Sequence, residues 1–163
     1  DAIIAELKRL APNCKLAEVT GGEPLMQDNC SVLVDRLLAE GYTVLVETGG
    51  SYDISVISEK AVRIVDVKCP DSGMHHRNDF ENMNRLTRRD EVKFVIASRK
   101  DYDWSKTILK GYDLSLKCKV LFSPVFGSIE LKDLAEWIIE DQLDVRLQMQ
   151  LHKVVWDPEK KGV

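Results

Sequence analysis

The sequence predicts an α/β fold, a partial (β/α) barrel of about six mostly parallel strands. Three observations support this prediction. Segments typical of strands alternate with segments of helical periodicity along the chain. The strand segments are almost continuously apolar, as in parallel sheets that helices cover. The connections are short and 163 residues suit one domain, so we expect residues 1–163 to form a single domain without an internal linker.

The first elements are a helix, a strand and a second helix. We expect a helix over residues 2–10 because their apolar side chains recur at helical spacing. Residues 15–20 are strand-like and end at two consecutive glycines. A helix over residues 28–40 begins at an Asp-Asn pair that can cap it, and Gly41 can end it.

The middle of the chain continues the alternation. Residues 43–47 read as a strand and residues 53–60 as a short helix. A strand over residues 62–67 is followed by a loop, and residues 79–89 then read as a helix. The next apolar run, residues 91–97, predicts another strand.

The last third repeats the pattern once more. Helices over residues 103–111 and 130–141 lie on either side of a strand at 119–122. Residues 144–150 predict the last strand. We expect the C-terminal tail, residues 151–163, to have no regular structure, because it contains a proline and a glycine.

The composition excludes several classes of protein. A chain with 44% hydrophobic and 31% charged residues is neither disordered nor of low complexity. Its formal net charge of −4 argues against a dedicated nucleic-acid binder, which usually has a basic stripe. The apolar runs are far shorter than the ~20 residues that span a bilayer. We therefore expect neither a nucleic acid nor a membrane as a partner.

The cysteines give no sign of a metal site. They are Cys14, Cys30, Cys69 and Cys118. No two are close enough in sequence to form the short pairs of zinc or iron–sulfur sites. His75 and His76 lie near Cys69, but no third ligand has suitable spacing. Four cysteines in a chain that starts without a secretory signal pattern fit a reducing compartment, so we expect the protein in the cytoplasm.

Polar and glycine-rich clusters follow four of the predicted strands. Because the carboxyl ends of parallel strands meet at one edge, these clusters would form a single rim, where ligands bind in such folds. A strand-to-helix turn also needs glycine and proline, so each cluster alone is weak evidence. The clusters are residues 20–24, 47–51, 66–70 and 123–127.

The first cluster, Gly-Gly-Glu-Pro after a strand, resembles a signature of radical S-adenosylmethionine enzymes, where its backbone borders the methionyl amino group of the cofactor. Longer segments together resemble the 7-carboxy-7-deazaguanine synthases of that family, from about Cys14 to the end of the chain. The segments Asp-Val-Lys-Cys-Pro and Gln-X-His-Lys favour this member in particular. The matching segments are residues 19–25, 44–50, 66–73, 90–96 and 147–153.

The resemblance implies a radical SAM-like core and a reaction. A [4Fe-4S] cluster would reduce S-adenosylmethionine to a deoxyadenosyl radical, which abstracts hydrogen from 6-carboxy-5,6,7,8-tetrahydropterin. The ring then contracts with loss of ammonia to 7-carboxy-7-deazaguanine, a precursor of queuosine-type nucleosides. Mg²⁺ would bind substrate oxygens. A homodimer and an electron donor such as flavodoxin are also implied.

The resemblance also implies site residues, although none is assigned as the catalytic acid or base. The expected S-adenosylmethionine contacts are Gly21, Gly22, Glu23, Thr48, Asp66, Val67, Lys68, Ser123, Pro124, Val125 and Phe126. The expected substrate contacts are Thr20, Glu47, Gln150 and His152. Structural alternatives stay open, such as a turn carboxylate for Glu23, strand-end propensity for Thr20 and core cover for Phe126.

Two geometric expectations accompany these assignments. Asp66 and Lys68 would point to the same side of their strand without forming a direct pair. Gln150 and His152, together with Gln148, would share one face if the last strand stays extended, where amides and an imidazole suit the edge of a pterin. A dimer or tail contact is the alternative for these three residues.

One feature departs from the family. Its cluster is held by three cysteines in a CxxxCxxC-type loop, and no such spacing occurs here. We expect that loop, the preceding strand and the threonine that binds Mg²⁺ upstream of Asp1, so that this chain is a truncated barrel without a metal ligand and is inactive alone. Two alternatives are another small radical enzyme, such as a glycyl-radical activase, and a non-catalytic binding domain with a degenerate cluster site.

Overall fold

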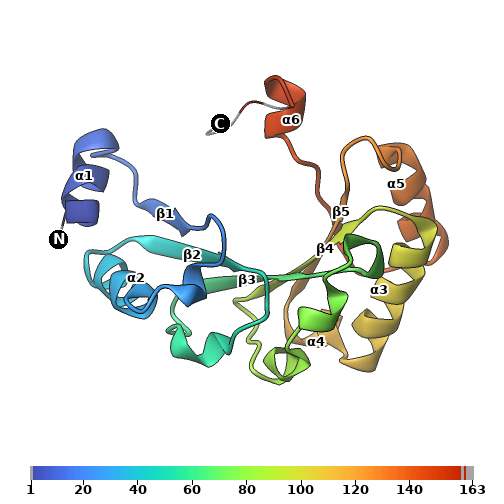
Figure 1. Cartoon of the computed structure of the whole chain (residues 1–163), viewed down its shortest axis with the longest axis horizontal. Helices are drawn as coiled ribbons and strands as arrows, with labels where there is room; N and C mark the ends of the chain where they lie inside the picture. The colour runs from blue at the N-terminus through green and yellow to red at the C-terminus, as the bar shows by residue number, and fades with distance from the viewer. Residues whose placement is uncertain (1, 159, 161–163) are drawn as a thin grey trace.

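The computed structural model describes residues 2–158 and 160 (Figure 1). These residues form one six-stranded parallel sheet in which the strands follow each other in sequence order. The strands are β1 (Leu16–Val19), β2 (Thr43–Thr48), β3 (Val62–Val67), β4 (Glu91–Ile96), β5 (Lys119–Pro124) and β6 (Arg146–Leu147). The predicted α/β fold with a parallel sheet is therefore confirmed.

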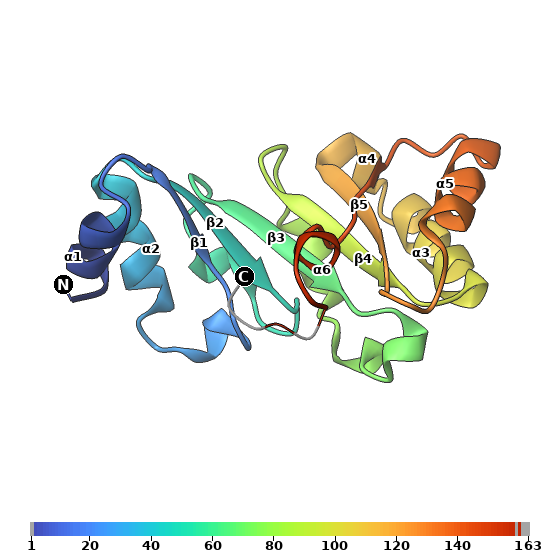
Figure 2. The same ribbon diagram turned by 90° about the horizontal axis from the view of Figure 1, so that it is seen from above.

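The sheet is curved, and helices cover its outer face (Figure 1). The α-helices are α1 (Ala2–Leu10), α2 (Cys30–Ala39), α3 (Arg99–Gly111), α4 (Leu114–Lys117), α5 (Leu131–Glu140) and α6 (His152–Val155). In both ribbon views, α6 lies over the open, inner face of the sheet, as Figure 2 shows from above.

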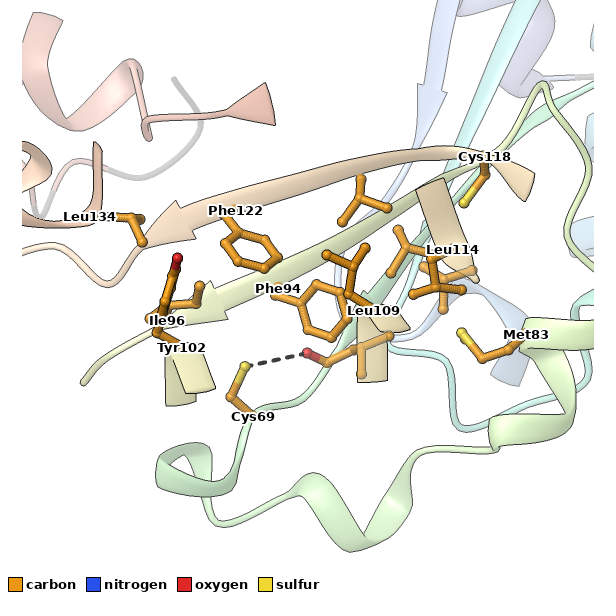
Figure 3. Packing of buried hydrophobic residues seen from close by; sticks show 14 of the residues in the cluster. Cys69, Met83, Phe94, Ile96, Tyr102, Leu109, Leu114, Cys118, Phe122 and Leu134 are labelled. Atoms are coloured by element: carbon orange, nitrogen blue, oxygen red, sulfur yellow. Dashed lines mark hydrogen bonds between the residues drawn. The ribbon is translucent and has the colours of Figure 1, made fainter. Parts of the chain in front are cut away.

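Burial alternates along the strands and separates the two faces. Val92, Phe94 and Ile96 of β4 are fully buried, whereas Lys93 between them faces the inner side. The buried side chains form two apolar clusters under the sheet. The larger includes Phe94 and Phe122, whose rings meet edge to face at 5.5 Å (Figure 3). The core thus lies on the helix side, where Arg63 is buried with it in an ion pair with Asp90, and the half-buried Glu47, Asp66 and Lys93 lie on the other side.

Two predicted helices are replaced by short 3₁₀ turns. The segment predicted at 53–60 forms only the turn Ile54–Val56, which Asp53 caps by accepting from the Ser55 backbone N–H. The segment predicted at 79–89 forms only Phe80–Asn84.

The cause of the second difference is Asn82, a fully buried residue. Its Oδ1 accepts from the Ile54 backbone N–H, and its Nδ2 donates to the carbonyls of Gly50 and Tyr52. The Arg85 carbonyl accepts from the Arg63 guanidinium. These tertiary hydrogen bonds replace those of a longer helix.

Other boundaries also differ from the prediction. Helix α3 begins at Arg99 rather than 103, because the Ser98 hydroxyl accepts from the Asp101 N–H and caps it. Neither residue of the Asp-Asn pair provides a side-chain cap for α2; Asn29 holds the capping position without a capping hydrogen bond. The loop predicted from residue 123 is partly wrong, since β5 continues to Pro124.

The C-terminal prediction needs two corrections. The last strand ends at Leu147 instead of residue 150. The tail is not irregular throughout, because His152–Val155 form one helical turn. The Gln148 N–H still donates to the Phe122 carbonyl at 2.9 Å, so the chain leaves the sheet just after that bond.

Candidate active site

The loop after β1 presents bare backbone to the carboxyl edge of the sheet. Gly21 and Gly22 have φ of 92° and 57°, a region that favours glycine. A Cβ at either position would meet no atom within 4 Å. The glycines are therefore required by the backbone conformation, and their peptide groups face open space that a ligand can enter.

Glu23 joins this loop to the next one. Its Oε1 accepts from the Leu25 N–H at 3.0 Å and from the Thr48 hydroxyl at 2.8 Å. Its Oε2 accepts from the Gly49 N–H at 2.7 Å. Both carboxylate oxygens are thus engaged by the protein, so this geometry fixes the relative position of two rim loops.

Ion pairs line the inner face of the central strands. Glu47 of β2 pairs with Lys93 of β4, and its other oxygen accepts from the Thr20 hydroxyl at 3.4 Å. Asp66 Oδ2 lies 2.8 Å from Lys68 Nζ. The expectation that Asp66 and Lys68 do not pair directly is wrong, because both lie on one side of β3 and the lysine side chain reaches back two residues.

Two cavities meet at the Asp66–Lys68 pair. The first, the glycine cavity, has a volume of about 400 Å³ and the second, the Gln150 cavity, about 520 Å³, both in the range of small-molecule sites. The glycine cavity is lined by Thr20, Gly21, Gly22, Glu23, Glu47, Thr48, Gly49, Ser51, Asp66, Lys68, Met74 and Arg77. The Gln150 cavity is lined by Asp66, Val67, Lys68, Cys69, Asp71, Ser72, Lys93, Val95, Ala97, Asp101, Val125, Ser128 and Gln150.

Two buried acceptors in these cavities lack a partner among the described residues. They are Asp66 Oδ1 in β3 and Gln150 Oε1 after β6. Buried polar atoms are nearly always hydrogen-bonded, and an unpaired one costs about 1–3 kcal/mol. A ligand with N–H or O–H groups between them would remove that cost.

The fourth rim cluster is only partly in the site. Ser123 is buried at the end of β5, and Val125 lines the Gln150 cavity. Pro124, Val125 and Phe126 line a neighbouring, more apolar cavity of about 300 Å³ together with Gln150. The Phe126 ring is half exposed, with Lys153 Nζ 5.4 Å from its centre, so it does not serve as core cover.

His152 is not brought to either cavity. It begins α6 and is exposed, and the chain is not extended there, so the expected common face of Gln150 and His152 does not form. The expectation assumed strand alternation beyond residue 147, where the sheet has already ended.

Some lining residues were missed in the sequence. Met74 and Arg77 come from the segment after β3, and Lys93 comes from the middle of β4. The Asn78 side chain brings that segment back, since its Oδ1 accepts from the Lys68 N–H and its Nδ2 donates to the Lys68 carbonyl, both at 2.9 Å. An isolated lysine on a strand gives no signal of its own, but its place directly opposite Asp66 on the neighbouring strand follows once the strands are aligned.

The cysteines and histidines stay apart in the described residues, where no three Cys, His, Asp or Glu side chains could hold a metal ion. Cys69 is buried, and its sulfur lies 3.5 Å from the Ser105 hydroxyl. Burial is the main cause that raises the pKa of this thiol to about 12. His75 and His76 are exposed. No helix among the described residues is long and apolar enough to cross a membrane.

A curved parallel sheet with a two-part polar cavity at the carboxyl ends of its strands defines an enzyme of the α/β-barrel type. No family model matches the chain. It is similar to 7-carboxy-7-deazaguanine synthase from Koribacter versatilis, with 44% identity over all of this chain and 78% of the relative. The same enzyme from Chlorobaculum tepidum is 40% identical over 94% of this chain and 71% of the relative.

Solved structures show the same fold. QueE from Escherichia coli superposes with a TM-score of 0.73 at 20% identity, over 91% of this chain and 61% of that one. SuiB from Streptococcus suis, solved with S-adenosylmethionine, superposes with a TM-score of 0.56 at 10% identity, over 83% of this chain and 39% of that one. The chain belongs to the 7-carboxy-7-deazaguanine synthase family of enzymes. The resemblance seen in the sequence motifs is thereby confirmed.

Proposed function

We propose that the protein uses S-adenosylmethionine to convert 6-carboxy-5,6,7,8-tetrahydropterin into 7-carboxy-7-deazaguanine with loss of ammonia, in the cytoplasm. Family membership supports this reaction and argues against the glycyl-radical activase alternative. The observation that carries the proposal is the pair of unpartnered buried acceptors, Asp66 Oδ1 and Gln150 Oε1, in adjoining cavities of ligand size.

The glycine cavity suits the methionyl part of S-adenosylmethionine. The peptide groups of Gly21 and Gly22 can approach its amino group closely, and the Asp66 carboxylate can accept from the same ligand. Lys68 already neutralises one oxygen of Asp66, which leaves the other free to accept. Reductive cleavage of this cofactor supplies the deoxyadenosyl radical that abstracts hydrogen from the substrate.

The adenosyl part is assigned to the end of β5 and the loop after it. Pro124, Val125 and Phe126 line the apolar cavity beside the Gln150 cavity and provide apolar contact area, and the buried Ser123 precedes them in β5. Thr48 and Val67 are almost fully buried, at 2% exposure each, and line the glycine cavity and the Gln150 cavity respectively.

The pterin is assigned to the polar residues between the two cavities. A pterin presents N–H donors along one edge, which Gln150 Oε1 and the Glu47 carboxylate can accept. Thr20 holds Glu47 in place through its hydroxyl. His152 would join this set only if the tail moved toward the sheet, and its assignment stays a prediction.

The described residues do not fit the [4Fe-4S] cluster or the Mg²⁺ ion. Among them, no group of three Cys, His, Asp or Glu side chains is placed to coordinate a metal ion, and three of the four cysteines are buried. We therefore assign the cluster and Mg²⁺ ligands to a segment upstream of Asp1 and derive no step through them. A homodimer and an electron donor such as flavodoxin belong to the same proposal.

Product analysis tests the proposal. The protein with the upstream three-cysteine segment is reconstituted with iron and sulfide without oxygen and supplied with S-adenosylmethionine, Mg²⁺, reductant and the tetrahydropterin. Mass spectrometry should find 7-carboxy-7-deazaguanine, and residues 1–163 alone should give none. Deoxyadenosine without the deazaguanine would overturn the assigned substrate. Neither product from protein with an intact cluster would overturn the enzyme assignment.

Variants test whether the cavity residues matter. Asp66→Asn and Gln150→Leu should each lower kcat/KM at least tenfold, since each removes a ligand acceptor worth ~1.5 kcal/mol or more. In Asp66→Asn the remaining oxygen faces the Lys68 ammonium, so that an NH₂ donor takes the place of the free acceptor. Asp35→Asn and Gln148→Leu are the matched controls, because both side chains are exposed and neither lines the cavities. Equal activity of the cavity variants and their controls would overturn the site assignment.

A further inference from the structure

The glycine cavity contains one cation that the protein does not neutralise. Its three carboxylates are all engaged, Glu23 by N–H and hydroxyl donors and the other two by lysines. Both lysines in the two cavities, Lys68 and Lys93, are used in those pairs. Arg77 lines the same cavity, and its guanidinium makes no hydrogen bond or ion pair with another described residue, whereas its backbone N–H donates to the Met74 carbonyl.

The backbone around Arg77 is nevertheless firmly held. Asn78, the next residue, makes both of its amide hydrogen bonds to the Lys68 backbone at 2.9 Å. The Asp79 N–H donates to the Gly50 carbonyl at 2.9 Å. The segment is thus attached on one side to the end of β3 and on the other to the loop after β2. An unpaired guanidinium on a fixed backbone is prepared to bind an anion with little ordering cost.

We propose that Arg77 binds a carboxylate of the bound ligand and thereby selects ligands that have one. This inference rests on the proposed function, in which both ligands have a carboxylate: the methionyl group of S-adenosylmethionine and the 6-carboxyl of the pterin. A guanidinium binds a carboxylate through two parallel N–H···O bonds. The carboxylates that line the cavity do not pair with the Arg77 guanidinium, because their partners are Lys68, Lys93 and backbone N–H groups. The guanidinium is therefore available to a carboxylate of the ligand.

Binding to ligand pairs that differ only in the carboxylate tests the proposal and identifies its source. The reconstituted protein is titrated calorimetrically with S-adenosylmethionine and its decarboxylated analogue, and separately with 6-carboxypterin and pterin. Arg77→Gln should lower the affinity for one of the two carboxylated ligands about tenfold and leave the affinity for its analogue without the carboxylate unchanged. Arg77→Lys should retain part of the affinity, because it keeps the charge but loses the bidentate geometry.

Arg89→Gln is the matched control. Arg89 is also exposed, and its guanidinium has no partner among the described residues. It precedes β4 at the opposite edge of the sheet, and its replacement changes the net charge by the same amount. It should alter no affinity. An equal loss for carboxylated and decarboxylated ligands, or no loss, in Arg77→Gln would overturn the role of Arg77 alone. Failure of the wild-type protein to bind either parent ligand would overturn the proposed function as well.

Discussion

The substitution Glu23→Gln tests how the rim of the site is held together. The carboxylate of Glu23 accepts three hydrogen bonds, from Leu25, Thr48 and Gly49, at 2.7–3.0 Å. A glutamine oxygen can keep the first two bonds, but its NH₂ group then faces the Gly49 N–H. Two donors would oppose each other where a charge-assisted bond existed.

The size of the effect follows from that change. A hydrogen bond to a charged group contributes about 1.5–3 kcal/mol, and an unpaired, partly buried donor costs about 1–3 kcal/mol. Water reaches this rim because Glu23 is half-buried, so we take the lower end. The free energy of unfolding should fall by about 2 kcal/mol.

Urea unfolding followed by circular dichroism measures this loss. Glu18→Gln is the matched control, since Glu18 is exposed on β1, and it should change stability by less than about 0.5 kcal/mol. A double-mutant cycle with Thr48→Val should show about 1 kcal/mol of coupling between the two side chains. A stable Glu23→Gln variant, or a cycle without coupling, would refute the conclusion that Glu23 joins the two loops.

Three further predictions concern the fold. Gly50→Ala should cost about 2–4 kcal/mol in urea unfolding, because φ is +70° and the new Cβ would lie 2.9 Å from a core valine; a cost below about 1 kcal/mol would contradict this. Iodoacetamide at pH 8 should label the exposed Cys14 and spare Cys69, because burial raises the pKa of the Cys69 thiol to about 12. Labelling of Cys69 in the native protein, detected by mass spectrometry, would refute its burial. Burial opposes the ionisation of Asp90, but hydrogen bonds, chiefly from Arg63, outweigh the effect of burial and lower the pKa of this carboxyl. The stabilisation that the ionised Asp90 provides above about pH 4 should therefore be lost as the pH falls through the pKa of Asp90 in the folded protein. Asp90→Asn should lose about 3–5 kcal/mol at pH 7 and flatten that acid-side dependence in unfolding titrations; an unchanged pH profile would contradict this.

The strands could be predicted from the sequence because their signal is local. Strand-like segments alternating with helical ones marked all six, although the last is shorter than predicted, and parallel pairing then followed from the alternation with helices. Since the carboxyl ends of parallel strands share one edge, the first three polar clusters were correctly placed together. Family motifs added the expected ligands.

The errors arose where long-range hydrogen bonds outweigh local preference. The helix expected over 79–89 fails because buried Asn82 bonds to the loop after β2. The place of Arg77 in the lining of the glycine cavity was not predicted for the same reason, since the hydrogen bonds from the Asn78 side chain to the Lys68 backbone join residues ten apart without periodicity. The last strand was predicted too long, and with it a common face for Gln150 and His152, because no sequence signal marks where this strand leaves the sheet.

A crystal structure of the reconstituted protein with S-adenosylmethionine and 6-carboxypterin would test the central claim most directly. We predict that both ligands lie in the joined cavities, with hydrogen bonds to Asp66 Oδ1 and Gln150 Oε1. The opposite edge of the sheet has another cavity of about 380 Å³, lined in part by Arg88 and Lys119. Ligands there, or ligands in the predicted cavities that leave both acceptors unpartnered, would contradict the site.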